Sequence, residues 1–449
     1  MGEIIEGEGR CFGMASTSLR FFAGLDEPAN YQPGATNTYA LSKSNARENI
    51  IYYQISQLAN PVSREINASQ NKLPSVILAE LVENMSHEIN DLSQIFFSHP
   101  SSGSHGVSTF AIEEKPSGEF WVYVYDNNHP DDDNRYIIIN PSANTWSYDL
   151  GGSFSIWHGG EGTNNPNSIG IVPNSVNNVP DGGYECPFCD EASSARNQSV
   201  QAATKSTVLL NGSGHLLITN STGQRIGYEG EIFINEIAGA FGNTIIDGSG
   251  IPHEPIYNLP LEDNYTILLD GETITETTEV SVSKFGPGYA VSLDNVNLNP
   301  NDTDQMMISS DGKQIVFAAT AEKQADLGVA LDGTEESSKY ELQNVDIGAG
   351  KEISLTVNSN TTELVFETGD NSGEYNLIVE VANGTGEHSF MHSNIIIHST
   401  DSHYIRYGDW DGEGEMEICV DEGSTGQIDS CTMLENEINK IYLPIIIKN

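Results

Sequence analysis

Apolar residues recur at helical spacing through the first hundred residues of the chain. Phe12, Ala15, Leu19 and Phe22 fall on one face of a helix that starts near Cys11. The same spacing predicts two further helices, one before Pro61 and one after Pro74, with apolar positions at Ile51, Ile55, Leu58, Leu78, Leu81, Val82, Met85 and Ile89. We therefore expect residues 11–97 to be largely helical.

From residue 105 onward the hydrophobic period changes to two. Val107, Thr109 and Ala111 alternate with other residues, and strand-like runs follow at 120–125, 136–139 and 145–148 between turn signals. Helices followed by an antiparallel sheet predict an α+β domain over residues 1–150.

The rest of the chain divides by composition and strand spacing. Residues 151–203 are rich in Gly, Asn, Pro and Ser and are expected to form a linker or extension. Short strands at regular spacing then predict a β-sandwich module over 204–300 and a second over 301–400, with an acidic β-rich segment over 401–449. No clear internal repeat is visible. The predicted fold class is a multidomain chain, an α+β domain followed by an all-β region.

Charge narrows the range of partners. The 449 residues include 19 Lys and Arg against 64 Asp and Glu, a formal net charge of −45. Phosphate recognition needs basic patches, so nucleic acid is not an expected partner and an anionic membrane surface is disfavoured. No apolar run is long enough for a membrane-spanning helix, so no membrane insertion is expected.

The number and spacing of the five cysteines bear on the cellular location of the protein. Cys186 and Cys189 form one close pair and Cys419 and Cys431 another, which leaves Cys11 as an odd thiol. Two disulfides and one reactive thiol are typical of an exported protein, so an extracellular or cell-surface location is expected. A zinc or redox role for Cys186 and Cys189, or a pair of buried thiols, stays open. The first residues lack a secretion signal, and we expect this sequence to begin downstream of the natural start.

The strongest candidate chemistry lies in Cys11, His105 and Asp126. A thiol at a helix start is activated by backbone N–H groups and the helix dipole, and a histidine can exchange its proton. Such a histidine needs a third group to fix its orientation, and Asp126, at the end of a strand, is expected to supply it. Asn127 is the alternative. Small residues around the thiol and the histidine, Gly9, Gly13 and Ser104, are expected to bind the substrate.

These residues carry a resemblance. Gly9-x-Cys11-x-Gly13-Met14-Ala15, Ser104-His105-Gly106-Val107 and Val124-Tyr125-Asp126-Asn127-Asn128 together resemble the papain-like cysteine peptidase domain of bacterial secreted and surface proteins. More loosely, they are similar to bacteriocin-processing cysteine peptidases. The resemblance covers residues 1–150 and implies a papain-like fold with Cys11 as nucleophile, His105 as base and Asp126 as orienting group.

The chain departs from the plant and lysosomal papain pattern. It lacks a Cys-Gly-Ser-Cys-Trp motif, and residues 1–10 contain no Gln or Asn that could donate to an oxyanion. In the second half, residues 215–228 and 235–240 resemble Ig-like β-sandwich modules of bacterial extracellular proteins. That resemblance implies an Ig-like all-β region.

A weaker signal concerns calcium. Asp409, Asp411 and Glu413 alternate as carboxylates do in calcium loops, although the full twelve-residue pattern is missing and a solvated turn explains them as well. No other cofactor is expected.

These observations predict a secreted or cell-surface cysteine peptidase acting on peptide or protein substrates through a thioacyl intermediate. A transglutaminase-like or amidase acyl transfer with the same three residues is one alternative. A catalytically silent surface adhesion or structural protein is the other. The β-rich region would supply contacts to extracellular partners.

Overall fold

The computed structural model shows a chain dominated by β-structure, with 50% strand and 16% helix. Its residues group into two compact units, one made of residues 1–186 with 243–253 and the other of residues 187–242 with 254–449. The structure describes residues 9–42, 44–59, 61–70, 72–87, 91–99, 103–149, 157–160, 168–177, 205–230, 232–243, 245–246, 248, 253–261, 263–333, 336–383, 386–410 and 412–438.

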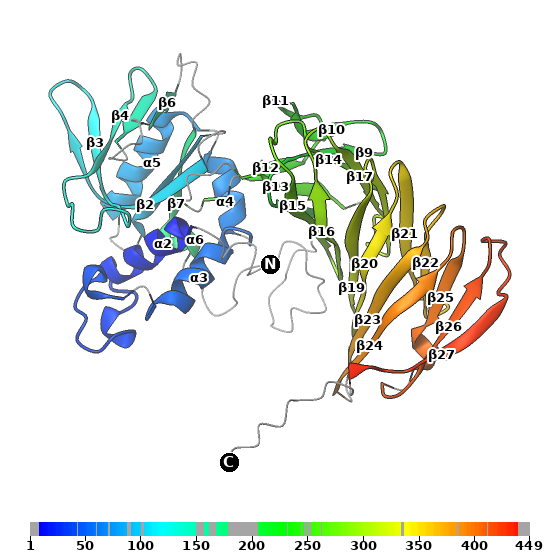
Figure 1. Ribbon diagram of the computed structural model, residues 1–449. Helices are drawn as coiled ribbons and strands as arrows, with labels where there is room; N and C mark the ends of the chain where they lie inside the picture. Colours follow the sequence, from blue (N-terminus) through cyan, green and yellow to red (C-terminus); the bar gives the residue numbers. More distant parts are fainter. Residues whose placement is uncertain are drawn as a thin grey trace. The chain divides into compact units, whose positions relative to one another are not determined.

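The first unit carries the longer helices (Figure 1). Its helices are α2 (Cys11–Phe22), η1 (Pro28–Asn30), η2 (Thr38–Ala40), α3 (Arg47–Ser56), α4 (Val62–Ser69), α5 (Pro74–His87) and α6 (Asn174–Asn177). Its strands are β1 (Ser93–His99), β2 (Gly103–Glu114), β3 (Phe120–Tyr125), β4 (Tyr136–Asn140), β5 (Thr145–Tyr148), β6 (Trp157–Gly160) and β7 (Ser168–Pro173). The strands form one antiparallel sheet in the order β6-β5-β4-β3-β2-β1-β7.

Alternation along the strands separates two apolar layers on this sheet. Ile95 and Phe97 of β1 pack with Leu81 and its neighbours on α5. Phe96 points the other way and packs with residues of α2 and α4, including Phe12. The sheet therefore lies between α5 on one face and α2 with α4 on the other, because successive side chains of a strand point to opposite faces.

The fold-class prediction is wrong. We expected a papain-like α+β domain led by helices and followed by Ig-like sandwich modules, whereas the chain is mostly β and is organised on three large antiparallel sheets in its described part. The physical reason lies in the strands after residue 150. β6 extends the first sheet beyond β5, and β7 pairs with β1, so residues assigned to a linker complete a seven-stranded sheet.

The second unit is entirely strands and turns in its described part, apart from η5 (Tyr407–Asp409). Its strands are β8 (Lys205–Asn211), β9 (His215–Asn220), β10 (Arg225–Glu229), β11 (Ile232–Asn235), β12 (Phe241–Asn243), β13 (Ile256–Pro260), β14 (Tyr265–Asp270), β15 (Thr278–Gly286), β16 (Tyr289–Leu298), β17 (Thr303–Ile308), β18 (Gln314–Ala319), β19 (Lys323–Asp332), β20 (Glu336–Ile347), β21 (Lys351–Asn358), β22 (Glu363–Glu367), β23 (Gly373–Asn383), β24 (Gly386–Ile397), β25 (Ser402–Arg406), β26 (Met416–Asp421) and β27 (Ser430–Leu434).

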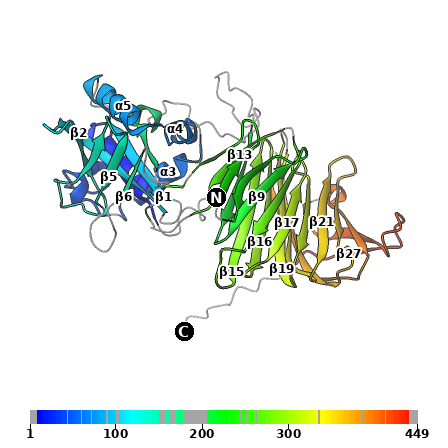
Figure 2. The same ribbon diagram turned by 90° about the horizontal axis from the view of Figure 1, so that it is seen from above.

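Two long sheets share one core in this unit. The described strands form a sheet of eleven, in the order β11-β10-β9-β14-β17-β18-β21-β22-β25-β26-β27, and a sheet of nine, in the order β12-β13-β8-β15-β16-β19-β20-β23-β24. Buried apolar residues from both sheets form a single cluster, which runs the length of the unit. Figure 2 shows the strands of both sheets side by side along this unit.

The predicted boundary near residue 300 does not separate two compact units. β16 pairs with β19 across it in one sheet, and β14 pairs with β17 across it in the other. Residues assigned to two modules and to a C-terminal segment therefore share continuous sheets.

A repeat that the sequence analysis missed builds this unit. Strands β15–β18, β19–β22 and β23–β26 each place one hairpin in the sheet of nine and the next hairpin in the sheet of eleven. The positive-φ positions recur with the repeat, and they are Asn295, Asn301 and Gly312, then Asn344, Gly350 and Thr362, then Asn394, Thr400 and Gly412. Each repeat thus adds two strands to each of the two sheets, as in other stacked-repeat architectures.

Candidate functional site

Cys11 is the first residue of α2 and lies almost entirely buried, at 2% exposure. The backbone N–H of Gly106 donates a hydrogen bond to its Sγ at 3.1 Å. A helix start and an N–H donor both favour the thiolate over the thiol. This position gives the sulfur the electrostatic surroundings that a nucleophilic cysteine needs.

His105 and Asp126 are joined by a buried hydrogen bond. Nε2 of His105, at the start of β2, lies 2.9 Å from Oδ1 of Asp126, directly after β3. Phe97, the cross-strand neighbour of His105 on β1, meets the imidazole edge-on, with the two ring centroids 5.7 Å apart. The strand-end position predicted for Asp126 therefore brings its carboxylate to the histidine.

The carboxylate of Asp126 is held from several sides. The Tyr148 hydroxyl donates to Oδ2 at 2.6 Å, and the Asn128 backbone N–H donates to Oδ1 at 2.9 Å. Nε of Arg135 lies 3.6 Å from Oδ2. Burial alone would raise the pKa of Asp126, but its hydrogen bonds and the nearby imidazole outweigh burial and hold the pKa well below its usual range. Asp126 is therefore a fixed negative charge behind the imidazole.

The other ring nitrogen of His105 lies in the same neighbourhood as the sulfur. A Cβ added to Gly248 would lie 3.1 Å from Sγ of Cys11 and 3.2 Å from Nδ1 of His105. Because both atoms lie so near one point, they are separated by no more than about twice that distance. Nδ1 is buried and has no hydrogen-bond partner within the described part of the chain. The imidazole thus stands between a carboxylate and a thiol.

Asn127, the alternative orienting residue, makes no hydrogen bond to the imidazole within the part of the chain that the structure describes. Its side-chain amide donates instead to Sδ of Met14 at 3.3 Å. The geometry therefore favours Asp126 over Asn127 as the partner of His105.

The predicted substrate-binding residues have different surroundings. Gly9 is half-buried just before α2. Gly13 faces α3, where an added Cβ would lie 2.0 Å from the Ile50 carbonyl oxygen, so helix packing explains this glycine. Ser104 precedes His105, and its hydroxyl donates to the Ile245 carbonyl at 2.6 Å. Of these three residues, Ser104 makes a polar contact beside the candidate site.

The remaining site predictions lie in the second unit or outside the described residues. A disulfide joins Cys419 and Cys431, as the sequence predicted. Cys186 and Cys189 fall outside the described residues, and so does Asp411 of the calcium candidate. Among the described residues, the one group of potential ligand atoms that lie close together is Glu417 with Cys419 and Cys431. The two sulfurs are joined in the disulfide, and the group includes neither Asp409 nor Glu413.

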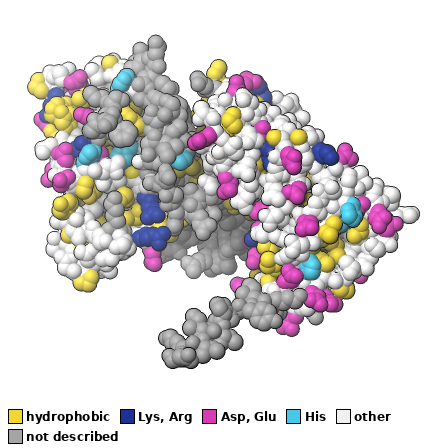
Figure 3. Space-filling model, viewed as in Figure 1, with side chains coloured by type: hydrophobic (Ala, Val, Ile, Leu, Met, Phe, Trp, Pro, Cys, Tyr) yellow, Lys and Arg dark blue, Asp and Glu magenta, His cyan; other side chains and the backbone are white. Residues whose placement is uncertain are grey.

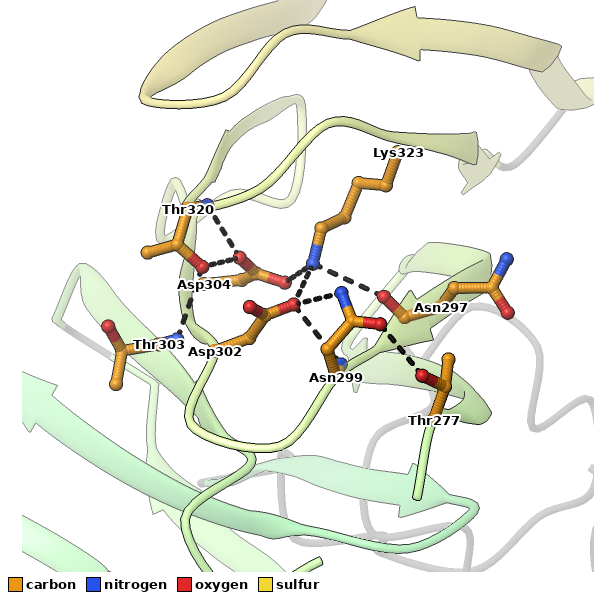
Figure 4. Close-up of polar contacts among 8 residues, drawn as sticks. All are labelled: Thr277, Asn297, Asn299, Asp302, Thr303, Asp304, Thr320 and Lys323. Atoms are coloured by element: carbon orange, nitrogen blue, oxygen red, sulfur yellow. Dashed lines mark hydrogen bonds and ion pairs between the residues drawn. The ribbon is translucent and has the colours of Figure 1, made fainter. Parts of the chain in front are cut away.

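A second group of charged side chains lies in the second unit, where the ammonium of a lysine lies between two carboxylates (Figure 4). Nζ of Lys323 contacts the carboxylates of Asp304 and Asp302, the latter at 2.9 Å, and the carbonyl oxygen of Asn297 at 3.2 Å. Thr320 donates twice to the other oxygen of Asp304, each time at 2.7 Å. The ammonium occupies the place that a cation would take, so the cluster joins β17 to β19 as a structural ion pair.

Sequence reasoning missed several residues at the candidate site. Gly106 supports the sulfur, and Tyr148 and Arg135 support the carboxylate. Gly106 and Tyr148 lie in ordinary strand patterns and Arg135 directly before β4, so none of them carries a chemical signature in the sequence. Gln54 lies on α3, and its side chain accepts the Gly13 N–H and donates to the Ile246 carbonyl. Only the tertiary structure shows these two contacts. Tertiary structure alone identifies such supporting residues.

Acidic side chains are spread over the visible surface instead of gathering in one patch (Figure 3). No helix in the described part of the chain is both long and apolar enough to cross a membrane. Comparison with known proteins finds no family model, no curated protein and no solved structure that matches this chain.

Proposed function

We propose that this protein is an extracellular or cell-surface thiol hydrolase, which cleaves peptide or amide bonds through a thioester on Cys11. One observation carries the proposal. The buried imidazole of His105 is hydrogen-bonded through Nε2 to the Asp126 carboxylate, and its Nδ1 and the Cys11 sulfur both lie within about 3.2 Å of one point beside Gly248. A nucleophile, a base and a group that orients the base are the parts that nucleophilic acyl transfer requires.

The reaction would proceed in two steps. The Cys11 thiolate attacks the substrate carbonyl carbon, the C–N bond breaks, and the His105 imidazolium gives its proton to the leaving amine. The neutral imidazole then takes a proton from water, and the resulting hydroxide attacks the thioester and releases the acid with regeneration of the thiol. Asp126 stabilises the imidazolium and fixes the ring.

An apolar pocket beside these residues supports a side-chain-selective substrate. The pocket has a volume of about 160 Å³, and it is lined in part by Met14 on α2, Ile50 on α3 and Asn127 next to Asp126. Its size suits one apolar side chain, so the proposed substrate is a peptide that presents such a side chain. The Cys419–Cys431 disulfide supports a location in an oxidising compartment.

The decisive variant is Cys11→Ala. We expect peptide hydrolysis to fall about a thousandfold or more, because loss of a nucleophile removes the covalent route. We also expect iodoacetamide modification at position 11 to disappear, as checked by peptide mass spectrometry. A Cys186→Ser/Cys189→Ser double variant controls for the other thiols and should retain hydrolysis.

The products separate hydrolysis from other acyl transfers. Free carboxyl ends support the hydrolase, whereas cross-linked or amine-capped products would indicate a transglutaminase-like transfer. Full hydrolysis by Cys11→Ala would refute the proposal.

A further inference from the structure

A segment of the chain distant in sequence returns to the candidate site. Residues 243–253 lie in sequence between strands of the second unit, yet they belong to the first unit. We call four of its described residues, Asn243, Ile245, Ile246 and Gly248, the returning segment. The Asn243 side chain donates to the Ser63 carbonyl at 3.0 Å and anchors the start of this segment.

Side chains around Cys11 bind the backbone of the returning segment. Ser104 donates to the Ile245 carbonyl, as described above. Gln57 accepts the Ile246 N–H at 2.8 Å, and Gln54 donates to the Ile246 carbonyl at 2.8 Å. Gln54 also accepts the N–H of Gly13, so its amide links α2 to this segment. Hydrogen bonds to the main chain are the contacts by which a cleft holds an extended peptide.

The side chain of Ile246 is fully buried next to Cys11 and Phe12. Two residues later, Gly248 covers the reacting atoms. A Cβ at this position would lie 3.0 Å from Cβ of Cys11, in addition to its short distances from Sγ and Nδ1. Gly248 also has a φ of +77°, a conformation that other residues adopt at a cost. Glycine is thus favoured on two grounds, the close contacts and the backbone angle.

We propose that the returning segment is an internal pseudosubstrate. It occupies the peptide-binding cleft of the proposed hydrolase uncleaved, with Gln54, Gln57 and Ser104 as its peptide-binding side chains. Substrate then reaches Cys11 only when this segment moves away. The inference rests on the proposed function for the nature of the cleft.

The test is Gly248→Ala in the full chain. The added methyl group and the positive φ both oppose the bound position of the segment, so the exposed fraction of Cys11 rises. We expect alkylation of Cys11 by iodoacetamide to accelerate about tenfold or more, because the observed rate scales with the accessible fraction. Peptide hydrolysis should rise in parallel. Site-specific mass spectrometry would follow position 11.

Gly118→Ala is the matched control. Gly118 has a φ of +80° in the same unit, but an added Cβ would meet nothing within 4 Å. Gly118→Ala should therefore carry the same conformational cost of a positive φ and leave the alkylation rate of Cys11 unchanged. Ile246→Ala compared with Ile66→Ala gives a second pair, since both remove a buried side chain of one cluster and only the first loosens the segment.

The outcomes separate the two proposals. Faster alkylation of Gly248→Ala without hydrolysis of any peptide would support occlusion and count against the hydrolase. Hydrolysis that depends on Cys11 and does not change in Gly248→Ala or Ile246→Ala would overturn the pseudosubstrate. Cleavage of the wild-type chain within residues 243–253 would also overturn it, because the segment would then be a substrate.

Discussion

Asp126 shows how one residue depends on its surroundings. A carboxylate at 0% exposure would be costly by itself, yet it accepts hydrogen bonds from His105, Tyr148 and Asn128. Its charge stabilises an imidazolium that forms during acyl transfer. Asp126 acts through His105, so it is a positioning residue.

We predict that Asp126→Ala lowers peptide hydrolysis about a hundredfold or more, the usual contribution of a general acid–base group. The ratio of the Cys11 alkylation rate at pH 6 to that at pH 9 should also fall. Without the carboxylate, the imidazolium of His105 is less stable and supports the Cys11 thiolate less, and an unassisted thiol ionises only near about pH 8.5. A purely structural role would not change this ratio. Asn127→Ala is compared by the alkylation ratio alone, because Asn127 also lines the proposed substrate pocket. An equal fall of that ratio in this variant would contradict the assignment.

At the scale of elements, the asparagines of the repeat bend the strands. Asn295, Asn344 and Asn394 each have a φ of +58°, and each lies at a register shift in a hairpin of the sheet of nine. A bulge increases the local twist of a strand pair, and asparagine accepts a left-handed backbone more readily than most residues. These asparagines therefore keep the three repeats similar in shape.

We predict that Asn344→Ala lowers the free energy of unfolding by about 1 kcal/mol, because alanine pays the cost of the left-handed conformation. Asn344→Gly should be neutral or slightly stabilising. The Asn344 N–H donates to Asp326 at 2.7 Å, and both variants keep this bond. Urea unfolding measures the difference, and equal loss in both variants would assign the effect to the side chain instead.

At the scale of the whole molecule, net charge opposes compaction. A balance of −45 over 449 residues leaves most carboxylates without a basic partner nearby. Their mutual repulsion is lower in the unfolded chain, where the charges lie further apart. The second unit offsets this cost with one continuous apolar core and with buried pairs such as Lys323 and Asp304.

We predict that added salt stabilises the protein. Raising NaCl from about 0.01 M to about 0.15 M shortens the screening length from about 30 Å to about 8 Å and weakens this repulsion. The melting temperature should rise, by about 2–4 °C for each kcal/mol gained. Choline chloride should act equally, which excludes specific sodium binding, and a melting temperature that falls with salt would contradict the charge argument.

Local features were predictable from local patterns. The helix that begins at Cys11 and the strands at 120–125 and 145–148 follow from hydrophobic periodicity, which depends only on neighbouring residues. The Cys419–Cys431 bond was predicted from close spacing. The fold class failed because pairing is not local. β1 pairs with β7, and β5 pairs with β6. Both partner strands come from a stretch whose composition indicated a linker.

By itself, the sequence determined the chemistry available to this protein, namely one odd thiol, a histidine at a strand start and an aspartate at a strand end. Only the tertiary structure decided that His105 pairs with Asp126, and that Gly248 lies beside both its imidazole and the Cys11 thiol. It also decided that three repeats share two sheets. The reason is physical. Side-chain type and period are properties of short stretches, whereas contacts between residues far apart depend on how the whole chain buries its apolar surface.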